Sequence, residues 1–373
     1  MTSQSIVLQA EHMPMSGIAS PGPHQTYRHP RLSLQERELG TLNDHSIRIE
    51  MLYAGICGTD IHAVQTNPDT GYLRSSAPMH IPPEGRIIGH EGVGRIIEVG
   101  KHVSHVALND YVTLESIVAC HHCAMCRRGK FNQCLNAKLV GLEKDGIFGT
   151  VVDVPATLAH NINDIVEKNG DKGLRATACM EPAAVAYVGC ENASIQGGDA
   201  IAVFGGGPIG LLSAMLSERV FGAAEVYLIE PLPFRREFAK QWCDKVYSVE
   251  EFLTEESLHV DVVIEASGFM DNVTKMFHRI LPNGRVILLG RSGKPLMLDN
   301  IDHMITNEIS VYGSRGHLCG AYDAILRLCR NEKLALDNIV TDVIDGVDAL
   351  LKALNSPGDV IAKHCKVLAR LNK

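Results

Sequence analysis

Short apolar runs separated by helical patterns organise the second half of the chain. The runs span residues 201–204, 226–229, 260–268, 284–290 and 309–313. Each is short, and small residues bound most of them, which is typical of a buried strand. A helical pattern follows the first run before the second begins, so the two strands are expected to lie parallel. The pattern therefore predicts a doubly wound parallel α/β sheet in this half.

The first half of the chain has a different pattern of apolar and polar residues. Residues 46–53 (SIRIEMLY) exchange polar and apolar positions one by one, as a half-buried strand does. Strand character is also expected at 5–8, 32–39, 93–99 and 145–160, which together predict a β-rich domain. The segment 16–30, rich in Pro, Gly and His, predicts an exposed loop or insertion.

Three further segments complete the predicted elements. Helices are expected at 173–190 and 321–335, and an apolar-alternating strand at 362–368 that returns to the first domain. The proline-rich loop 64–88 separates two groups of chemically active residues. We expect that loop to cover a site and to take part in substrate recognition.

The first apolar run of the second half enters a glycine-rich turn. Gly205, Gly207 and Gly210 have the G-x-G-x-x-G spacing, with Pro208 and Ile209 completing the turn. Strand, turn and helix in this order predict a dinucleotide site with the pyrophosphate at the helix N-terminus.

An acidic residue ends the next strand. Glu230 lies 20 residues after Gly210, where a carboxylate accepts a hydrogen bond from the ribose 2′-OH and repels a 2′-phosphate. The sequence therefore favours NAD over NADP. Arg235 begins the following helix and is a candidate for the adenine side; a solvated helix face explains it equally well.

Two turns in the first half of the chain contain residues that can bind a metal ion. Cys57, Thr59 and His62 lie within six residues, and His90 and Glu91 follow in another glycine-rich turn. Taken singly these are ordinary core or surface residues. Together they supply the thiolate, imidazole and carboxylate ligands of catalytic zinc. Glu181, before Pro182, is either a helix-start carboxylate or a further ligand.

Four cysteines with C-x2-C-x2-C-x7-C spacing form a separate group: Cys120, Cys123, Cys126 and Cys134. Thiols at this spacing predict a closed, structural tetrahedral zinc site, with an iron–sulfur cluster as the main alternative.

Net charge, apolar run lengths and the cysteine count argue against several classes of function. A net charge of −8 argues against nucleic-acid binding, since phosphate contacts need clustered Lys and Arg. No apolar run approaches the ~20 residues of a membrane span, and the N-terminus lacks a signal-peptide pattern. A cytoplasmic location is expected, and the 11 cysteines are expected to be thiols or metal ligands.

The motifs G-I-C-G-T-D-x-H, G-H-E-x-x-G, the cysteine group, M-E-P and G-G-G-P-I-G-L occur in this order. The chain thereby resembles the zinc-dependent medium-chain dehydrogenase/reductase family. That resemblance implies a GroES-like catalytic domain over residues 1–182, joined by 321–373, and a Rossmann NAD-binding domain over 183–320. It also implies two zinc ions per chain and a homodimer or homotetramer.

Within the family, Cys57 and His90 match the first two catalytic zinc ligands. Simple alcohol dehydrogenases have cysteine where this chain has Glu181, whereas polyol, sugar and threonine dehydrogenases have glutamate, and Glu91 can also approach the metal. The resemblance thus implies oxidation of a polyol, sugar or cyclitol, with Thr59 and His62 passing the proton to solvent.

Other functions stay open at this point. An aminocyclitol dehydrogenase similar to 2-deoxy-scyllo-inosamine dehydrogenase and an L-threonine 3-dehydrogenase-like enzyme are the enzymatic alternatives. A zinc-free quinone reductase-like protein or a non-catalytic dinucleotide-binding subunit is the alternative without zinc chemistry. The sequence leaves the substrate unidentified.

Overall fold

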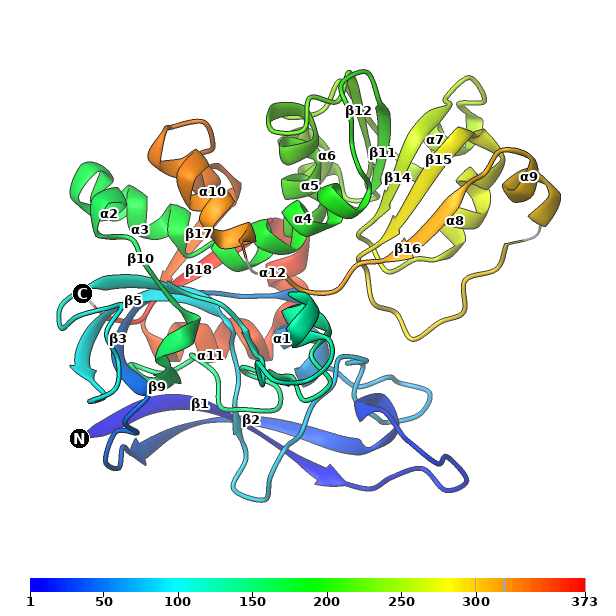
Figure 1. The fold of residues 1–373 in the computed structure, drawn as a ribbon. Helices are drawn as coiled ribbons and strands as arrows, with labels where there is room; N and C mark the ends of the chain where they lie inside the picture. Colours follow the sequence, from blue (N-terminus) through cyan, green and yellow to red (C-terminus); the bar gives the residue numbers. More distant parts are fainter. Residues whose placement is uncertain (299, 318–319, 373) are drawn as a thin grey trace. The chain divides into compact units, whose positions relative to one another are not determined.

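The computed structural model describes residues 1–298, 300–317 and 320–372, and these residues form two compact units (Figure 1). The first unit comprises Met1–Glu181, Tyr322–Ile361 and Lys366–Lys373, and the second comprises Pro182–Ala321 and Ala362–Cys365. Among the described helices, none is both long and apolar enough to cross a membrane.

The second unit is built on a parallel sheet of six strands in the order β13-β12-β11-β14-β15-β16. Its strands are β11 (Ala200–Phe204), β12 (Glu225–Ile229), β13 (Lys245–Tyr247), β14 (Val260–Glu265), β15 (Ile280–Leu288) and β16 (Ser310–Gly313). Figure 1 shows α5 and α6 on one side of this sheet and α7 and α8 on the other. Because both faces are covered, β11 is buried almost throughout, which explains its unbroken apolar run. The predicted parallel sheet is confirmed.

Helices precede or connect these strands. They are α4 (Met180–Asn192), α5 (Pro208–Arg219), α6 (Pro233–Ala239), α7 (Val249–Thr254), α8 (Asp271–Met276), η5 (Phe277–Arg279) and α9 (Ile301–Thr306). Pro208 occupies the first turn of α5, where its missing N–H costs nothing and its fixed φ suits a helix start.

The first unit is β-rich. Its strands are β1 (Thr2–His12), β2 (Tyr27–Glu38), β3 (Ser46–Gly55), β4 (Arg86–Ile87), β5 (Glu91–Val99), β6 (Tyr111–Leu114), β7 (Ile117–Val118), β8 (Lys138–Leu139), β9 (Val151–Pro155), β10 (Ala159–Asn161), β17 (Val340–Asp345) and β18 (Lys366–Arg370). The largest sheet has the order β10-β6-β5-β3-β18-β17, with β9 also paired to β3. The last strand of the chain thus lies next to β3, which carries the first candidate ligand turn at its end.

Helices of the first unit are η1 (Pro23–Gln25), α1 (Gly58–Val64), η2 (Cys126–Arg128), η3 (Phe131–Gln133), η4 (Ala156–Leu158), α2 (Asn163–Asn169), α3 (Asp171–Thr177), α10 (Ala321–Arg330), η6 (Leu336–Ile339), α11 (Val347–Asn355) and α12 (Pro357–Lys363). Buried residues of α11, among them Val347, Leu350 and Leu354, join the same apolar core as β1 and β18.

Several predicted elements were wrong in extent. The exposed loop 16–30 is shorter, because β2 begins at Tyr27 and pairs along β1 as a long hairpin. The helix 173–190 is two helices, α3 and α4, and the helix 321–335 ends at Arg330. The tail strand begins at Lys366 rather than 362, because α12 extends to Lys363.

Candidate functional site

Cys57 lies in the turn between β3 and α1. It occupies the N-cap of α1 with an extended backbone, and its N–H donates to Asp60 Oδ2 at 3.0 Å. Asp60 is fully buried, and this hydrogen bond fixes the turn that presents the thiol.

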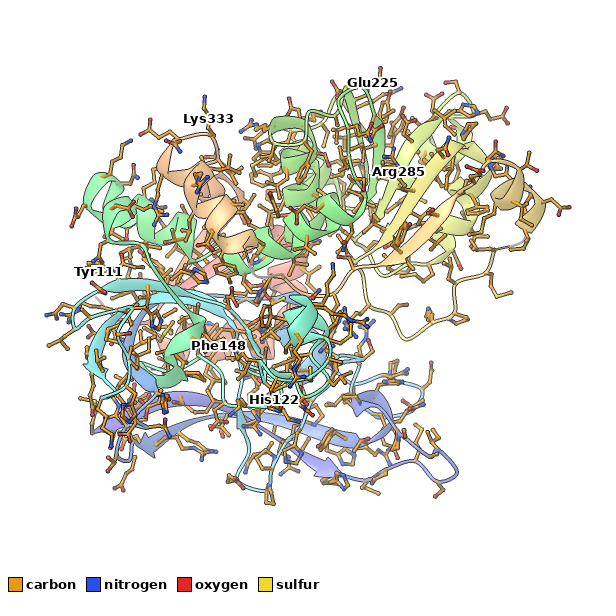
Figure 2. The ribbon with its side chains drawn as sticks, viewed as in Figure 1. Tyr111, His122, Phe148, Glu225, Arg285 and Lys333 are labelled. Atoms are coloured by element: carbon orange, nitrogen blue, oxygen red, sulfur yellow. The ribbon has the colours of Figure 1, made fainter. Side chains whose placement is uncertain are left out.

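His90 and Glu91 lie where β5 begins. Gly89 before them has φ +90°, and a Cβ there would lie 2.2 Å from Cδ1 of Phe148, which is labelled in Figure 2, so only glycine fits. The pairing of β3 with β5 sets Gly55 opposite Glu91, and that register brings the two turns together. The ligand atoms of Cys57, His90 and Glu91 all lie within 4.8 Å of one another.

Burial and neighbouring charges shift the pKa values of Cys57 and His90. Burial raises the pKa of the Cys57 thiol, as does Glu91, whereas His90 lowers it. Burial alone would lower the pKa of His90, but Asp60 and Cys57 hold it well above its ordinary value. His90 Nδ1 lies 3.6 Å from Asp60 Oδ1, and both atoms are buried without a hydrogen-bond partner. A thiol, an imidazole and a carboxylate converge here, which fits the chemistry of a zinc site.

Glu181 lies in the first turn of α4 and is buried. Its Oε1 accepts a hydrogen bond from Ser116 Oγ at 2.9 Å. Burial raises the pKa of Glu181 to about 7. Among the described residues, the close group of ligand atoms comprises Cys57, His90 and Glu91, and Glu181 lies outside it. His90 still lowers the pKa of Glu181, so the two side chains are neighbours.

A buried lysine completes the surroundings of Glu91. Lys366, on β18, is fully buried; its Nζ forms an ion pair with Glu91 Oε2 and donates to Ile56 O at 3.1 Å. Burial alone would lower the pKa of Lys366, but Glu91 together with Cys179 and Cys57 outweighs burial, and the pKa is raised. Sequence reasoning missed Lys366 and Ser116, whose roles depend on tertiary contacts. It also missed Asp60, for which the motif G-T-D gave a usable signal.

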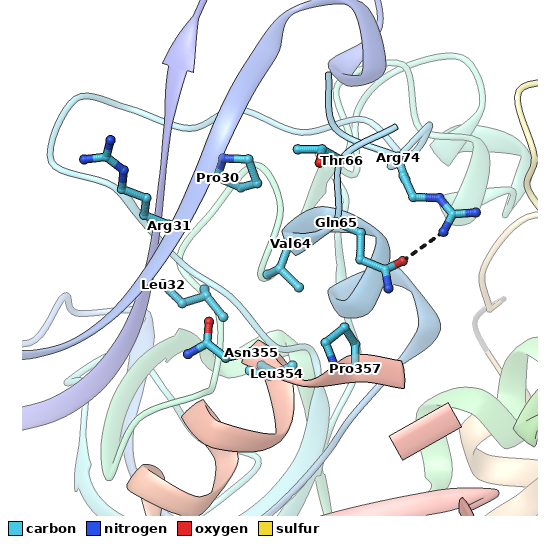
Figure 3. Close-up of a pocket in the computed structure, with 10 residues that line it drawn as sticks. All are labelled: Pro30, Arg31, Leu32, Val64, Gln65, Thr66, Arg74, Leu354, Asn355 and Pro357. Carbon is cyan, nitrogen blue, oxygen red and sulfur yellow. Dashed lines mark hydrogen bonds between the residues drawn. The ribbon is translucent and has the colours of Figure 1, made fainter. Parts of the chain in front are cut away.

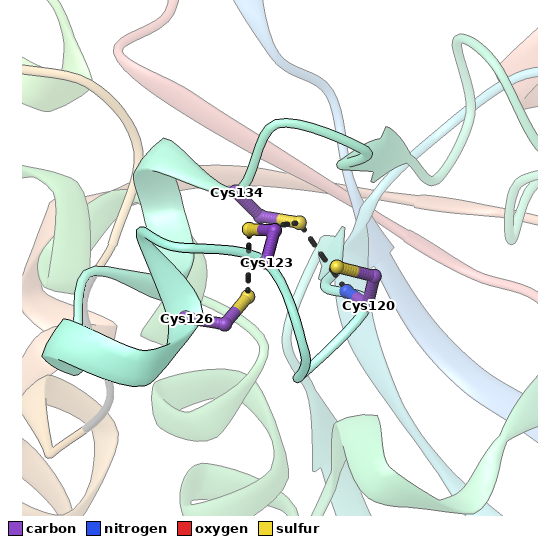
Figure 4. Close-up of side chains that lie close together, drawn as sticks. All are labelled: Cys120, Cys123, Cys126 and Cys134. Atoms are coloured by element: carbon purple, nitrogen blue, oxygen red, sulfur yellow. Dashed lines mark hydrogen bonds between the residues drawn. The ribbon is translucent and has the colours of Figure 1, made fainter.

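The four cysteines lie together on one loop of the first unit (Figure 4). Cys123 Sγ lies 3.6 Å from Cys126 Sγ and 3.9 Å from Cys134 Sγ. A tetrahedron with Zn–S bonds of about 2.3 Å has edges of about 3.8 Å, so these spacings fit zinc. N–H groups of Asn136 and Leu135 also donate to the sulfurs, which favours thiolates. Hydrogen bonding lowers the pKa of Cys120 to about 5, Asn136 contributing most.

The glycine-rich turn joins β11 to α5. Gly205 has φ +103°, and a Cβ on Gly210 would lie 1.8 Å from Gly205 O, so both positions need glycine. Gly207 is the N-cap of α5, and Pro208 and Ile209 follow in its first turn. The free N–H groups of this helix start suit a pyrophosphate.

Glu230 lies beside that turn. The carboxylate is buried and accepts hydrogen bonds from Gly206 N at 2.6 Å and Leu232 N at 2.8 Å. Arg235 is also close, with Nη1 3.7 Å from the Cβ position of Gly207. Arg235 Nη2 donates to His364 O at 3.2 Å, and its buried Nε has no hydrogen-bond partner.

Thr59 and His62 both lie on α1, and both are half-buried. Burial lowers the pKa of His62, and the charge of Arg74 lowers it further, so the imidazole is neutral at neutral pH. The far end of α1 borders a pocket of about 740 Å³ (Figure 3). Gln65, Thr66 and Arg74 from the predicted recognition loop line this pocket, and none of its ten lining residues is a candidate zinc ligand.

Two family models match the chain. Residues 43–164 match the alcohol dehydrogenase GroES-like domain, and residues 208–331 match zinc-binding dehydrogenase.

Curated and solved proteins are similar as well. L-threonine 3-dehydrogenase of Pyrococcus abyssi is 32% identical over 311 residues, 81% of this chain and 85% of that protein. D-xylulose reductase A of Aspergillus oryzae is 26% identical over 333 residues, 86% of this chain and 88% of that protein. The structure of a short chain alcohol dehydrogenase from Escherichia coli CFT073, complexed with NADH, superposes with a TM-score of 0.81 at 22% identity, covering 99% of each chain.

Proposed function

The chain belongs to the zinc-containing medium-chain alcohol dehydrogenase family, and we propose that it oxidises a secondary alcohol of a polyol, sugar or cyclitol to a ketone. Zinc- and NAD(P)-dependent oxidation of a CH–OH group is the activity of this family. The observation that carries the substrate class is the buried Glu181 carboxylate, which replaces the cysteine of simple alcohol dehydrogenases. The relatives named for threonine and xylulose support the same branch.

Each unit has its own part in the proposal. Residues 1–182 with 321–373 form the catalytic domain, and 183–320 form the NAD-binding domain. Cys57, His90 and one carboxylate hold the catalytic zinc, and the four cysteines hold the structural zinc. The charge of Glu91 is compensated by its ion pair with Lys366, whereas the Oε1 of Glu181 accepts from a neutral hydroxyl, that of Ser116. This difference favours Glu181 as the carboxylate ligand, oriented by Ser116.

The chain's own groups handle the proton. When bound, zinc supplies a Lewis acid that lowers the pKa of an alcohol, and the nicotinamide accepts the hydride. The Thr59 hydroxyl is placed on α1, two residues after Cys57, to accept the hydrogen bond of the substrate hydroxyl. His62, one turn further along α1 and kept neutral by burial and Arg74, receives the proton and returns it to solvent.

The experiment that tests this function combines metal analysis with a substrate screen. Zinc close to two ions per chain is expected, falling to about one in a Cys126→Ser variant. NAD reduction is then followed with polyols, sugars, cyclitols, amino alcohols and simple alcohols. Reduction with primary aliphatic alcohols alone would overturn the polyol assignment, and reduction with L-threonine or an aminocyclitol alone would replace it.

We expect Glu230 to set the cofactor preference. A Glu230→Gly/Pro231→Arg variant removes the carboxylate that would face a 2′-phosphate and adds a cation beside it. The ratio of kcat/KM for NADP to that for NAD should rise about 100-fold, since like-charge repulsion costs several kcal/mol. Glu225→Gln, at the opposite end of β12 (Figure 2), is the control and should leave the ratio unchanged. A wild-type enzyme that already prefers NADP would refute this role.

A homodimer or homotetramer is also part of the proposal. Ile301, Ile305 and Tyr312 of the second unit are 51%, 69% and 49% exposed, on α9 and on the edge strand β16. Exposed large apolar side chains on an edge strand and on the helix that precedes it in the chain suit a second protein surface. A monomeric mass in light scattering would contradict this assembly.

A further inference from the structure

Glu265 is a fully buried carboxylate at the end of β14. Its Oε1 accepts from Ser267 N at 2.6 Å, from Ser267 Oγ at 2.7 Å and from Gly268 N at 2.7 Å. Its Oε2 accepts from Asn272 Nδ2 at 3.3 Å. Burying a carboxylate is costly unless donors surround it, and these donors are neutral groups of the turn 266–268 and of α8. The side chain therefore holds that turn in one conformation.

The hydroxyl of Ser267 extends the same network. It donates to Glu265 Oε1 and accepts from Phe269 N and Asn272 Nδ2, both at 3.1 Å. Residues 266–268 are half-buried, whereas Glu265 is not exposed at all. The turn thus has a surface open to a ligand and an interior fixed by Glu265.

This turn lies against the glycine-rich turn of the cofactor motif. β11 and β14 are neighbouring parallel strands in which Phe204 pairs with Glu265, and Ala266 N donates to Phe204 O at 3.0 Å. A Cβ on Gly205 would lie 3.1 Å from Ser267 Cα. The backbone of the turn after β14 therefore contacts the first glycine of the motif.

The turn after β15 contacts the other side of the same segment. Gly290 N donates to Glu265 O at 2.9 Å, and a Cβ on Gly290 would lie 2.4 Å from Gly268 N. Backbone on both sides thus sets where the turn 266–268 lies, and the Glu265 side chain sets its internal conformation.

The strand order says which half of a dinucleotide meets this turn. Glu230, the candidate ribose acceptor, follows β12 on one side of β11, whereas β14 lies on the other side. A pyrophosphate bound at the start of α5 lies at the end of β11, between the two. An adenosine bound by Glu230 therefore leaves the nicotinamide half to the turn after β14. All of these elements belong to the second unit.

We propose that Glu265 is a positioning residue for the cofactor. It holds the turn 266–268 in the conformation that receives the nicotinamide half of the dinucleotide. A turn that is fixed beforehand loses less conformational entropy on binding, so affinity rises without any contact between Glu265 and the ligand. This inference rests on the proposed binding of NAD at the glycine-rich turn.

The test compares the Kd of NADH with that of AMP, which lacks the nicotinamide half, by titration calorimetry. Glu265→Met keeps the size of the side chain and removes the acceptor of the hydrogen bonds that hold the turn. We expect the Kd of NADH to rise about 10-fold or more and the Kd of AMP to change less than about twofold. An equal rise for both ligands would overturn the inference, because Glu265 would then act on the whole site.

Glu265→Gln is the conservative variant. Its amide oxygen can still accept from Ser267 N and Gly268 N, so the Kd of NADH should stay within about threefold of the wild-type value. A loss as large as that in Glu265→Met would show that the negative charge, rather than the held turn, supports binding. That result would also overturn the inference.

Asp261→Leu is the matched control for stability. Asp261 lies near the other end of β14, where its Oδ2 accepts from Ala200 N at 2.8 Å. Leucine has a similar size and removes this acceptor, so the Tm should fall as in Glu265→Met while the Kd of NADH stays unchanged. Weaker NADH binding in Asp261→Leu as well would assign the effect to a general loss of stability and refute the positioning role.

Ser267→Ala decides the question if Glu265→Met does not fold. It keeps the carboxylate but removes the hydroxyl that bonds to it, so the Kd of NADH should rise about threefold. An unchanged Kd would contradict the positioning role.

Failure of the inference can be told from failure of the proposed function. A wild-type protein that binds neither NADH nor NADPH would refute the cofactor site itself. If it binds NADPH alone, the same comparison is made with NADPH. Equal binding of the dinucleotide by the wild type and Glu265→Met would refute only the role of Glu265.

Discussion

Replacing Glu181 by alanine is expected to lower kcat/KM at least about 100-fold, equivalent to about 3 kcal/mol of transition-state stabilisation. The variant removes the proposed carboxylate ligand from a buried position, and with it the hydrogen bond from Ser116 Oγ. Zinc analysis should find the catalytic ion depleted or bound more weakly against a chelator, while the four-cysteine site keeps its own. Full zinc content with unchanged turnover would refute the ligand assignment.

Two further variants test which of Glu181 and Glu91 binds the zinc, and whether Ser116 acts by orienting the ligand. Ser116→Ala keeps the carboxylate but removes the donor that orients it, so zinc affinity should fall about 10- to 100-fold, less than in Glu181→Ala. Glu91→Gln keeps the shape of the side chain and removes the ion pair with Lys366. If Glu91→Gln depletes the catalytic zinc and Glu181→Ala does not, the resting ligand is Glu91.

Replacing Lys366 by methionine should destabilise the first unit by about 3–5 kcal/mol, because the change leaves the Glu91 carboxylate buried without its partner. Methionine has a similar length and fills the space, so the loss reports charge rather than packing. We expect the Tm of that unit to fall by roughly 10 °C. An unchanged Tm would show that the buried pair does not stabilise the fold.

The double variant Lys366→Met/Glu91→Gln provides the control. With both charges removed, much of the lost stability should return, and the coupling energy of the cycle measures the pair. Arg95→Met, which breaks the partly exposed ion pair with Glu50 at 2.7 Å, is the matched surface case. Its cost should stay below about 1 kcal/mol, since solvent screens such pairs.

Much of the fold could be predicted from the local pattern of apolar and polar residues. The apolar runs at 201–204 and 226–229 became the neighbouring strands β11 and β12, because strands covered on both faces must be apolar throughout. The predicted extent of the loop 16–30 was wrong because the pairing of β2 with β1 is a long-range contact that composition does not encode. The start of the tail strand was wrong because residues 362–363 suit a helix end and a strand equally.

For the site too, some residues could be predicted from the sequence and others could not. Cys57, His90 and Glu91 could be singled out by residue type and spacing, and the pairing of β3 with β5 then places them together. Lys366 could not, because a lone lysine near the end of a chain reads as a surface residue. Ser116 could not either, because its relation to Glu181 spans 65 positions and depends on where α4 begins.

The position of Lys366 also sets an order for assembly during synthesis. All four cysteines of the loop have been made by residue 134, so that loop is able to load its ion while most of the chain is still to come. The partner of Glu91 lies on β18 and is made 275 positions later. The buried charge of Glu91 is therefore balanced only after β18 has been made. A nascent chain that does not yet contain β18 would carry a folded cysteine loop together with an unfinished active site.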